Sequence, residues 1–455
     1  MNNQRSVFIH LSSRSASLAR IRRRLVLGTI WLCSLGFPAL SSAKKPVQPT
    51  TPAAKDVQGT TYLIGAEIHI GNGKVISKGV VEIADDRIVS VATLKNGATF
   101  PSTSTVIDVS GKWITPGLIA ARTDLGLVEI GMEESTRDNS RTDNTAIRAG
   151  HDPSLAINTD SSLVQIQAIE GVTSAAVSPK GGLISGSVAW FDLLAGNRED
   201  AVAARSVAVD AVLGRYHGSR AASFAMLRRA LDDARFYTRN VKAHERRQTR
   251  KLSAHPADLR ALLPLLDGTI PLTIEAHRAS DILGLIALAK DYELRLVIIG
   301  GTEAWKVAEA LAVAKIVVVL QPSANLPGSF DKLGARLDNA AILAKRGVTI
   351  AIAELEETHN LRNITQEAGI AVAYGLDPET ALSAVTLNVA TAYGMDKDYG
   401  SIEAGKIANL VVWEADPFEL DHWAEQVYVR GEAIDMRSRQ TDLRDRYRDL
   451  SRFRP

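Results

Sequence analysis

The sequence predicts an α/β fold in which a (β/α)8 barrel carries a small β-sandwich, and three observations support this. Apolar runs of four to six residues alternate with helix-patterned segments over roughly 290 residues. These runs lack a polar face, which is typical of parallel strands buried on both sides. Such long repetition favours a closed barrel over an open sheet. β-rich segments flank the region on both sides, at 57–113 and 402–435.

Residues 1–43 have the layout of a secretory signal peptide. They contain six arginines and no acidic residue, and the basic run RIRRR precedes an apolar run at 25–40. This run has 16 residues, fewer than the ~20 that a membrane-spanning helix needs. The small residues Ser41 and Ala43 follow it, where a signal peptidase would cut. We expect a cleaved signal peptide and a periplasmic or secreted protein. An uncleaved anchor is the alternative, and both the Sec and the twin-arginine routes remain open.

Charge and cysteine content exclude several classes of function. Removing residues 1–43 changes the net charge from +2 to about −4, which argues against a nucleic-acid partner. The only cysteine, Cys33, lies in the apolar run, so the mature protein would have no disulfide and no thiolate ligand or nucleophile. We expect a small-molecule substrate.

Two segments precede the barrel. Residues 44–56 are rich in Pro, Thr and Ala and are predicted to be a flexible linker. Residues 57–113 contain short alternating runs separated by turns such as Gly-Asn-Gly at 71–73, which indicates a small antiparallel sheet. This sheet is the predicted first part of the β-sandwich.

Residues 114–401 are predicted to form the barrel. Helix patterns occur at 279–292 and 303–315, among others, and a basic stretch at 235–251 is predicted to be an exposed helix and loop. The alternative for this stretch is a rim that attracts acidic substrates. The strand candidates are GLIAA at 117–121 and the runs at 172–177, 188–194, 271–276, 295–299, 316–320 and 348–353.

Strand patterns return at 402–435, the predicted second part of the sandwich, where ANLVVWEAD can pair with the N-terminal strands. Residues 436–455 are predicted to form an Arg-rich helix with seven arginines and three aspartates. We expect it to be exposed and to pack Leu443, Tyr447 and Leu450 on the body. Binding to an anionic surface is the alternative.

Three segments together resemble the amidohydrolase superfamily, in particular its imidazolonepropionase-like branch. They are VIDVSGKWITPGLIAARTDLG, GVTSAAVSPKGG, and the long stretch from AGIAVAYGLDPETALSAVTLN to GKIANLVVWEADPFEL. The resemblance covers roughly residues 60–435. It implies a TIM barrel, with the segments before and after it joined in one composite β-sandwich.

The resemblance also implies a metal site at the carboxyl ends of the barrel strands. The family's His-x-His pair on strand 1 matches Arg122 and Asp124, and its strand-5 histidine matches His277. Its strand-6 histidine falls on the glycines at 300–301, and its strand-8 aspartate falls at Glu354 or the following leucine. Arginine cannot ligate a metal, because its guanidinium stays protonated.

Two interpretations of this site remain open. In the first, Asp124, His277 and Glu354 are the catalytic groups, with Asp124 or Glu354 as the general base, and they are the ligands of one divalent metal, Zn²⁺ or Mn²⁺. The same general base acting without a metal is an open alternative. In the second, the site has no metal, His277 is a structural histidine, and Arg122 forms an internal ion pair with Asp124, Glu354 or both. Substrate contacts are assigned to Arg122, to Lys180 in the glycine-rich SPKGGLISG, and to His359. A flexible loop at Lys180 and a solvated cluster of acids at 354–357 are the simpler alternatives.

Two classes of function follow from these observations. The first is an exported hydrolase that acts on carbon–nitrogen bonds of a small molecule, with an altered or degenerate metal site. The second is a catalytically inactive binding protein, or a partner subunit of an intact paralogue. Homo-oligomerisation is compatible with both.

Overall fold

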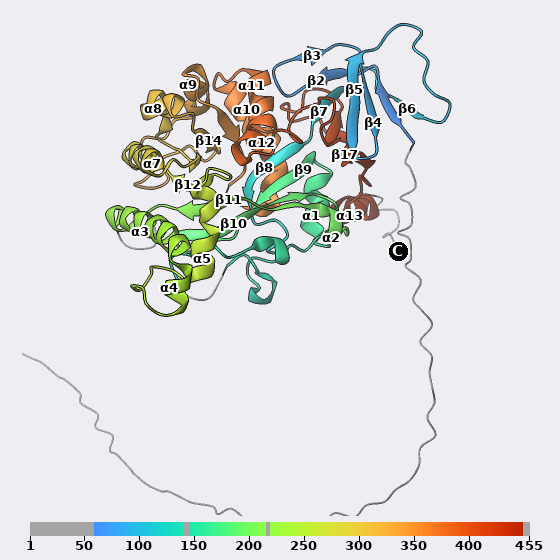
Figure 1. Ribbon diagram of the computed structural model, residues 1–455. Coiled ribbons are helices and arrows are strands. Elements are labelled where there is room, and N and C mark those ends of the chain that lie inside the picture. The colour runs from blue at the N-terminus through green and yellow to red at the C-terminus, as the bar shows by residue number, and fades with distance from the viewer. Residues whose placement is uncertain (1–58, 141–144, 215–218, 356, 449–455) are drawn as a thin grey trace, which may run out of the picture. The chain divides into compact units, whose positions relative to one another are not determined.

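The computed structural model describes residues 59–140, 145–214, 219–355 and 357–448, all within one compact unit at 56–455 (Figure 1). The predicted signal peptide at 1–43 and the predicted linker at 44–56 lie outside the described residues. Among the described helices, none is long and apolar enough to cross a membrane.

An eight-stranded sheet forms the barrel and confirms the predicted TIM-barrel type of fold. Its strands follow one another in chain order around the sheet. They are β8 (Leu118–Thr123), β9 (Val172–Val177), β10 (Ile184–Asp192), β11 (Val202–Val212), β12 (Leu272–Ala276), β13 (Leu296–Gly300), β14 (Val317–Leu320) and β15 (Ile350–Ile352).

Two features of this sheet differ from the prediction. Strand β10 runs antiparallel to both β9 and β11, whereas an all-parallel sheet was expected. The reason is the short connection at 178–183, which can form a hairpin but cannot hold the crossover that parallel strands require. Strand β11 was not identified at all, because the first half of the strand is partly exposed and lacks a continuous apolar run.

Most of the helices and 3-10 helices lie in the connections that follow barrel strands. Helix α7 occupies the predicted range 279–292. The α-helices are α1 (Ser162–Ala168), α2 (Arg198–Ala201), α3 (Arg220–Arg239), α4 (Val241–Glu245), α5 (Pro256–Ala261), α6 (Leu263–Leu266), α7 (Ala279–Tyr292), α8 (Ala308–Val313), α9 (Asn339–Lys345), α10 (Ile364–Ala373), α11 (Pro378–Ala384), α12 (Leu387–Tyr393) and α13 (Arg439–Arg448). The 3-10 helices are η1 (Glu134–Thr136), η2 (Pro153–Leu155), η3 (Ala304–Val307) and η4 (Thr358–Asn363).

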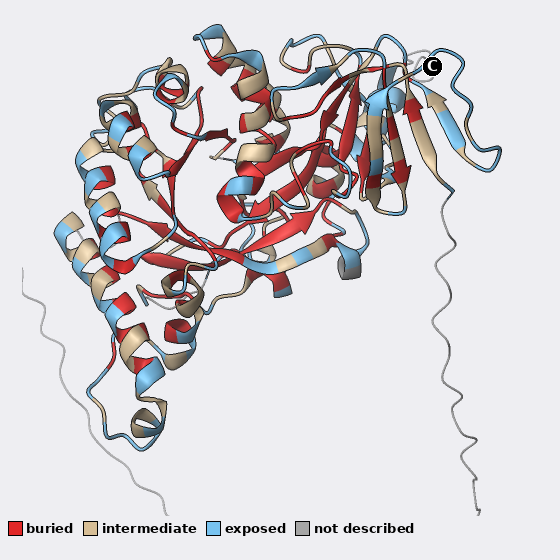
Figure 2. Ribbon diagram, turned by 45° about the horizontal axis from the view of Figure 1, so that its top comes forward, coloured by how far each residue is buried: buried red, intermediate tan, exposed pale blue. Residues whose placement is uncertain are grey.

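Apart from the first half of β11, the barrel strands are buried on both faces, while the outer helices expose one side (Figure 2). Alternate strand residues enter two different clusters, as expected when successive side chains point in opposite directions. One cluster packs under the outer helices, and the other fills the barrel interior together with side chains of α12.

Helix α12 lies against both terminal strands of the barrel sheet. The Tyr393 hydroxyl donates a hydrogen bond to the Ala121 carbonyl of β8. The Asn388 side chain donates one to the Ile350 carbonyl of β15, with an N···O distance of 2.8 Å. The helix thereby satisfies backbone groups on both strand edges and keeps the open seam of the sheet covered.

Two further sheets form the sandwich. The four-stranded sheet has the order β5-β4-β1-β6, and the six-stranded sheet has the order β18-β17-β16-β7-β2-β3. Because β7 pairs with β16 and β2, residues 114–116 belong to the sandwich, and the barrel sheet begins at Leu118 instead of residue 114. The strands are β1 (Thr61–Ile64), β2 (Glu67–His69), β3 (Val75–Ile76), β4 (Gly79–Ala84), β5 (Arg87–Thr93), β6 (Thr105–Asp108), β7 (Trp113–Pro116), β16 (Leu410–Trp413), β17 (Ala424–Val429) and β18 (Glu432–Ala433).

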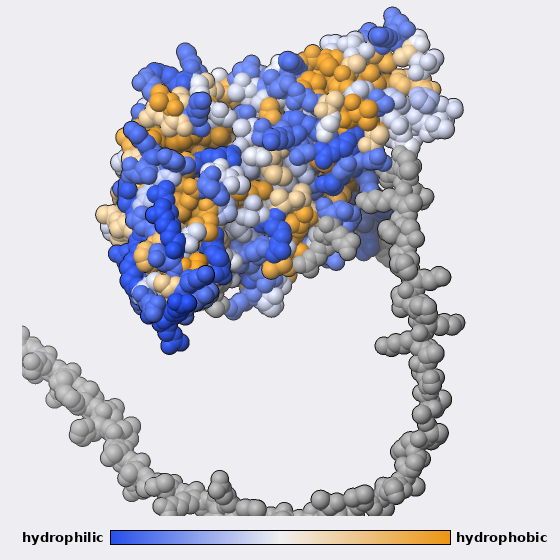
Figure 3. Space-filling model, in the orientation of Figure 1, coloured by the Kyte–Doolittle hydropathy of each residue, from blue (hydrophilic) through white to orange (hydrophobic). Residues whose placement is uncertain are grey.

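The two basic segments are exposed. Hydrophilic residues cover the surface over α3 and α4, which hold most of the basic stretch at 235–251 (Figure 3). Helix α13 has no buried residue in its described part. The helix contacts α1 on the body, but Leu443 and Tyr447 remain 40% and 52% exposed, so they pack against it only in part. Leu450 lies outside the described residues.

Candidate active site

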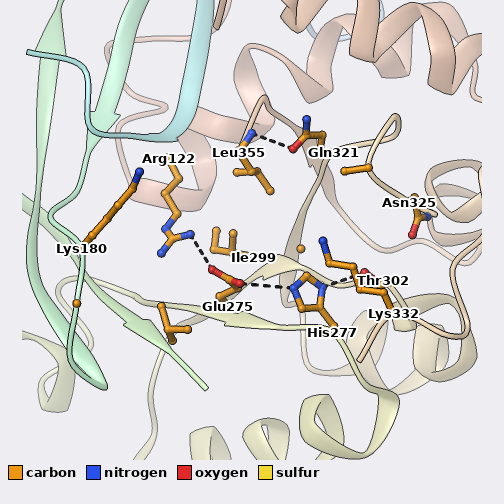
Figure 4. Close-up of a pocket in the computed structure, with 14 residues that line it drawn as sticks. Arg122, Lys180, Glu275, His277, Ile299, Thr302, Gln321, Asn325, Lys332 and Leu355 are labelled. Carbon is orange, nitrogen blue, oxygen red and sulfur yellow. Dashed lines mark hydrogen bonds and ion pairs between the residues drawn. The ribbon is translucent and has the colours of Figure 1, made fainter. Parts of the chain in front are cut away.

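A cavity of about 350 Å³ opens at the carboxyl ends of the barrel strands (Figure 4). This is the end at which TIM-barrel proteins place their sites, because the loops that follow the strands meet there. The residues that line it are Arg122, Lys180, Gly181, Val212, Glu275, His277, Ile299, Gly300, Thr302, Gln321, Ala324, Asn325, Lys332 and Leu355.

Arg122 reaches across the barrel to two other strands. Its Nε and Nη2 donate to the two carboxylate oxygens of Asp210 on β11, at 3.1 and 3.0 Å. Its Nη1 donates to Oε2 of Glu275 on β12, at 3.1 Å. The expected ion pair of Arg122 with Asp124 was therefore wrong. The residue lies where the pairing of β8 with β9 is irregular, so simple alternation along the strand does not give its direction.

Asp210, one of the two carboxylate partners of Arg122, is fully buried. Burial raises its pKa above the ordinary value, although Arg122 and a 3.0 Å hydrogen bond from the Thr273 hydroxyl oppose this shift. Burial lowers the pKa of Arg122, but the carboxylates of Asp210 and Glu275 raise it by more. The guanidinium is therefore fixed as a cation inside the barrel.

His277 lies between a carboxylate and a hydroxyl. Its Nε2 is 3.5 Å from Oε1 of Glu275, and its Nδ1 is 2.9 Å from Oγ1 of Thr302. Burial raises the pKa of Glu275, but His277 and Arg122 lower it by more, to about 2. A chain of contacts thus runs from Asp210 through Arg122, Glu275 and His277 to Thr302. Figure 4 shows the part of it from Arg122 to Thr302.

Gly300 makes room for the His277 ring. A Cβ at position 300 would lie 2.5 Å from Cε1 of that ring, and the backbone φ of +88° is itself unfavourable for other residues. A histidine at the family's strand-6 position is therefore incompatible with the observed orientation of His277.

Asp124 is held by three loops and is 4% exposed. It pairs with Nζ of Lys180 at 2.8 Å, accepts from Asn139 at 2.7 Å, and accepts from the Thr358 hydroxyl. Burial raises its pKa, but Lys180 and these hydrogen bonds lower it by more. The carboxylate is ionised and engaged, so a role as a general base stays a prediction.

The remaining predicted residues lie around the rim. Glu354 is 7% exposed, accepts from Nε2 of Gln321 at 2.9 Å, and lines a smaller cavity beside Arg122 and Asp124. The His359 side chain is 61% exposed on η4, where its Nδ1 is 3.9 Å from Glu357. Glu356, which belongs to the predicted acidic cluster, lies outside the described residues.

The residues present do not fit a divalent metal. Within the described parts of the chain, no group of three His, Cys, Asp or Glu side chains is placed to hold one, so the predicted set of Asp124, His277 and Glu354 is not assembled. The reason is that Lys180 binds the first carboxylate and Gln321 the last, while an arginine replaces a ligand on strand 1.

Sequence reasoning missed several residues of this site. Glu275 could have been found, because it stands two positions before His277 and therefore on the same side of the strand. Asp210 is a lone acid in the apolar run VAVDAV, which is itself a signal of a paired buried charge. The positions of Thr302 and Lys332 in the site depend on the conformation of the loops that carry them, and no sequence pattern indicates these positions.

A barrel sheet whose seam is covered by a helix, a cavity at the carboxyl ends of its strands and a composite sandwich are together typical of amidohydrolase-type barrel proteins. The profile described as "Amidohydrolase family" matches residues 144–434. The chain belongs to the amidohydrolase family.

Individual relatives agree with this assignment. The imidazolonepropionase of Pseudomonas paraeruginosa is 37% identical over 123 residues, which are 26% of this chain and 29% of that protein. The chain thus matches less than a third of the length of this curated relative. An amidohydrolase structure from Thermotoga maritima has a TM-score of 0.74 at 24% identity, covering 83% of this chain and 100% of that one. Phenylurea hydrolase B has a TM-score of 0.53 at 16% identity, covering 83% and 97%. These structures show the fold alone.

Proposed function

We propose that this protein is an exported hydrolase that cleaves a carbon–nitrogen bond of a small molecule without a divalent metal. The family assignment supports the reaction class, and the N-terminal layout of basic, apolar and small residues supports export. The cavity of about 350 Å³ suits a small molecule.

The contact of Arg122 with Asp210 and Glu275 carries the proposal of a metal-independent site. The guanidinium neutralises the carboxylates of Asp210 and Glu275, and its loss would leave the fully buried Asp210 without a counter-ion. A divalent cation at this place would have to sit beside a fixed positive charge. The ion pairs of Arg122 with Asp210 and Glu275 would therefore stabilise this site in the absence of a metal.

We assign the proton transfers of the reaction to His277. Its imidazole lines the cavity, and Glu275 holds it from one side at 3.5 Å. A histidine oriented in this way can remove a proton from an attacking group and return it to a leaving amine. No other histidine among the described residues lines this cavity.

The test is hydrolysis by metal-depleted protein. Mature protein is purified, its metal content is measured, and a panel of cyclic amides and dipeptides is assayed before and after treatment with EDTA. We expect less than stoichiometric metal, unchanged hydrolysis after chelation, and a loss of at least ~100-fold in kcat/KM in His277→Ala. The control is His422→Ala, a histidine in the connection between β16 and β17 that does not line the cavity. Stoichiometric metal whose removal abolishes hydrolysis would contradict the proposal.

A second candidate is a non-catalytic binding protein or the partner subunit of an intact paralogue. The contacts of Asp124 favour it, because Lys180, Asn139 and Thr358 engage the acid that stands at the family's strand-1 ligand position. The two candidates differ in outcome. Saturable binding of a panel compound without turnover, with or without added Zn²⁺ or Mn²⁺, favours the binding protein.

A further inference from the structure

Thr302 places a hydroxyl group beside His277 in the same cavity. The residue follows β13, is 3% exposed and lines the cavity. We propose that Thr302, His277 and Glu275 form a hydroxyl–imidazole–carboxylate triad in which Oγ1 of Thr302 is the nucleophile. This inference rests on the proposed hydrolase function and names the group that attacks the substrate.

The distances match the roles of such a triad. Oγ1 of Thr302 and Nδ1 of His277 are 2.9 Å apart, which is within hydrogen-bond reach for a nucleophile and its base. The second ring nitrogen, Nε2, faces Oε1 of Glu275 at 3.5 Å. Figure 4 shows the three side chains next to one another, joined by two dashed contacts.

The direction of the hydrogen bonds follows from the number of protons. A neutral imidazole carries one N–H, and an ionised carboxylate can only accept. In the neutral form of His277 the proton therefore lies on Nε2, towards Glu275, and Nδ1 is an acceptor. The hydroxyl of Thr302 then donates to Nδ1, which is the arrangement that a base needs to activate a hydroxyl nucleophile.

The carboxylate of this triad is itself held in place. Arg122 donates to Oε2 of Glu275 at 3.1 Å and leaves Oε1 for His277. The arginine is fixed by the bidentate contact with Asp210. The guanidinium therefore orients Glu275 and, through it, the base His277, and its effect reaches Thr302 through three contacts. Arg122 is a positioning residue.

The reaction balances without a further reagent. Oγ1 of Thr302 forms a bond to the amide carbonyl carbon while its proton passes to Nδ1 of His277. The carbon–nitrogen bond then breaks, and the same proton passes to the departing nitrogen. Water attacks the resulting threonyl ester, gives a proton to His277, and releases the acid as the proton returns to Oγ1. The net reaction is hydrolysis.

Lys332 provides the positive charge for the intermediate. Arg122 and Lys180 each contact carboxylates, whereas Lys332 lines the cavity without an ion pair to any carboxylate in the described residues. Its ammonium group is placed to offset the negative oxygen that forms when Thr302 adds to a carbonyl.

Covalent labelling tests the triad. Mature protein is treated with a fluorophosphonate probe, and its intact mass and labelled peptide are determined. We expect one adduct on Thr302, retained in Thr302→Ser and lost in Thr302→Val, which keeps the shape of the side chain. His277→Ala should slow labelling at least ~100-fold. Thr238→Ala is the matched control, because it removes an exposed hydroxyl on α3. Thermal unfolding shows that each variant is folded.

The amide panel separates the two proposals. If Thr302→Val hydrolyses amides as fast as the parent protein while His277→Ala does not, His277 activates water directly, and the triad is overturned while the metal-free hydrolase stands. If the parent protein neither labels nor hydrolyses any amide, both proposals fail. Labelling of Thr302 without amide hydrolysis supports the triad and contradicts the substrate class.

Discussion

At the residue scale, the ion pairs of Arg122 affect both the stability and the chemistry of the site. We predict that Arg122→Met lowers the free energy of unfolding by about 3–5 kcal/mol, because it leaves Asp210 buried without its counter-ion. Urea denaturation measures the change. Arg205→Met is the control, since that side chain is 63% exposed in its pair with Asp152 and should cost less than about 1 kcal/mol.

A second substitution separates charge from shape in this prediction. Adding Asp210→Asn to Arg122→Met removes the uncompensated charge, so part of the lost stability should return. An unchanged urea midpoint in the single variant would show that Arg122 does not stabilise the barrel.

A substitution at Gly300 tests whether the His277 ring needs the space that a Cβ at position 300 would fill. Gly300→Ala should cost about 1–3 kcal/mol and displace the ring, because its Cβ would lie 2.5 Å from Cε1. Gly347→Ala is a matched control. Its φ of +77° is similar, but no atom lies within 4 Å of the new Cβ, so it reports backbone strain alone. Equal losses in stability and in Thr302 labelling for both variants would disprove the packing argument.

The low pKa of Glu275 gives stability a dependence on pH. The pKa is about 2 in the folded protein against an ordinary value of 4.5, so this stabilisation is complete above pH 4.5 and is lost as pH falls towards 2. Glu275→Gln should therefore flatten the acid side of the stability curve. Urea midpoints at pH 3 and pH 7 measure this, with Glu432→Gln, an exposed residue of β18, as the control. A variant that loses as much stability on acidification as the parent protein would contradict the assignment.

The sequence was a better guide to which residue types occupy the site than to the contacts that they make. Arg122 in place of a metal-ligating histidine could be read from the sequence, because the family pattern gives the position. Its partner could not, because Asp210 lies 88 residues away on a strand that the apolar pattern did not reveal. Long-range pairing of buried charges depends on strand register, and single-sequence patterns do not contain it.

At the element scale, Asp124, which follows β8, contacts both the β9–β10 hairpin and the segment after β15. We predict that Asp124→Asn speeds amide hydrogen exchange at 178–183 and in η4, because the ion pair with Lys180 and the charge-assisted bond from Thr358 are weakened. Asp152→Asn, which alters an exposed ion pair, is the control. Unchanged exchange at both loops would show that they are held by other contacts.

The elements themselves followed sequence patterns where those patterns were long. Helix α7 and strand β9 occupy their predicted ranges because each is a complete amphipathic or apolar segment with clear ends. The orientation of β10 depends instead on a connection of six residues at 178–183. An antiparallel strand can be as apolar as a parallel one when both of its faces are covered, so composition could not reveal the difference.

At the scale of the whole molecule, the chain joins segments that are far apart in sequence. Strand β7 pairs with β16, almost 300 residues later, so the sandwich cannot form before the barrel segment has been synthesised. The family resemblance predicted this closure, whereas local patterns predicted only two separate β-rich regions. The whole chain is thus needed for either sheet of the sandwich to bury its inner face.

Charge distribution over the whole chain supports export. Six arginines precede the apolar run at 25–40, and the remaining chain carries about −4. We predict that the full-length chain, produced in a Gram-negative host, is recovered from the periplasm with residues 1–43 removed, so that its N-terminus is Lys44. Intact mass and N-terminal sequencing measure this. Replacing Arg22 and Arg23 by lysine separates the two routes, because a twin-arginine substrate would stay in the cytoplasm and a Sec substrate would still be exported. Full-length protein in the membrane fraction would show an uncleaved anchor and contradict cleavage.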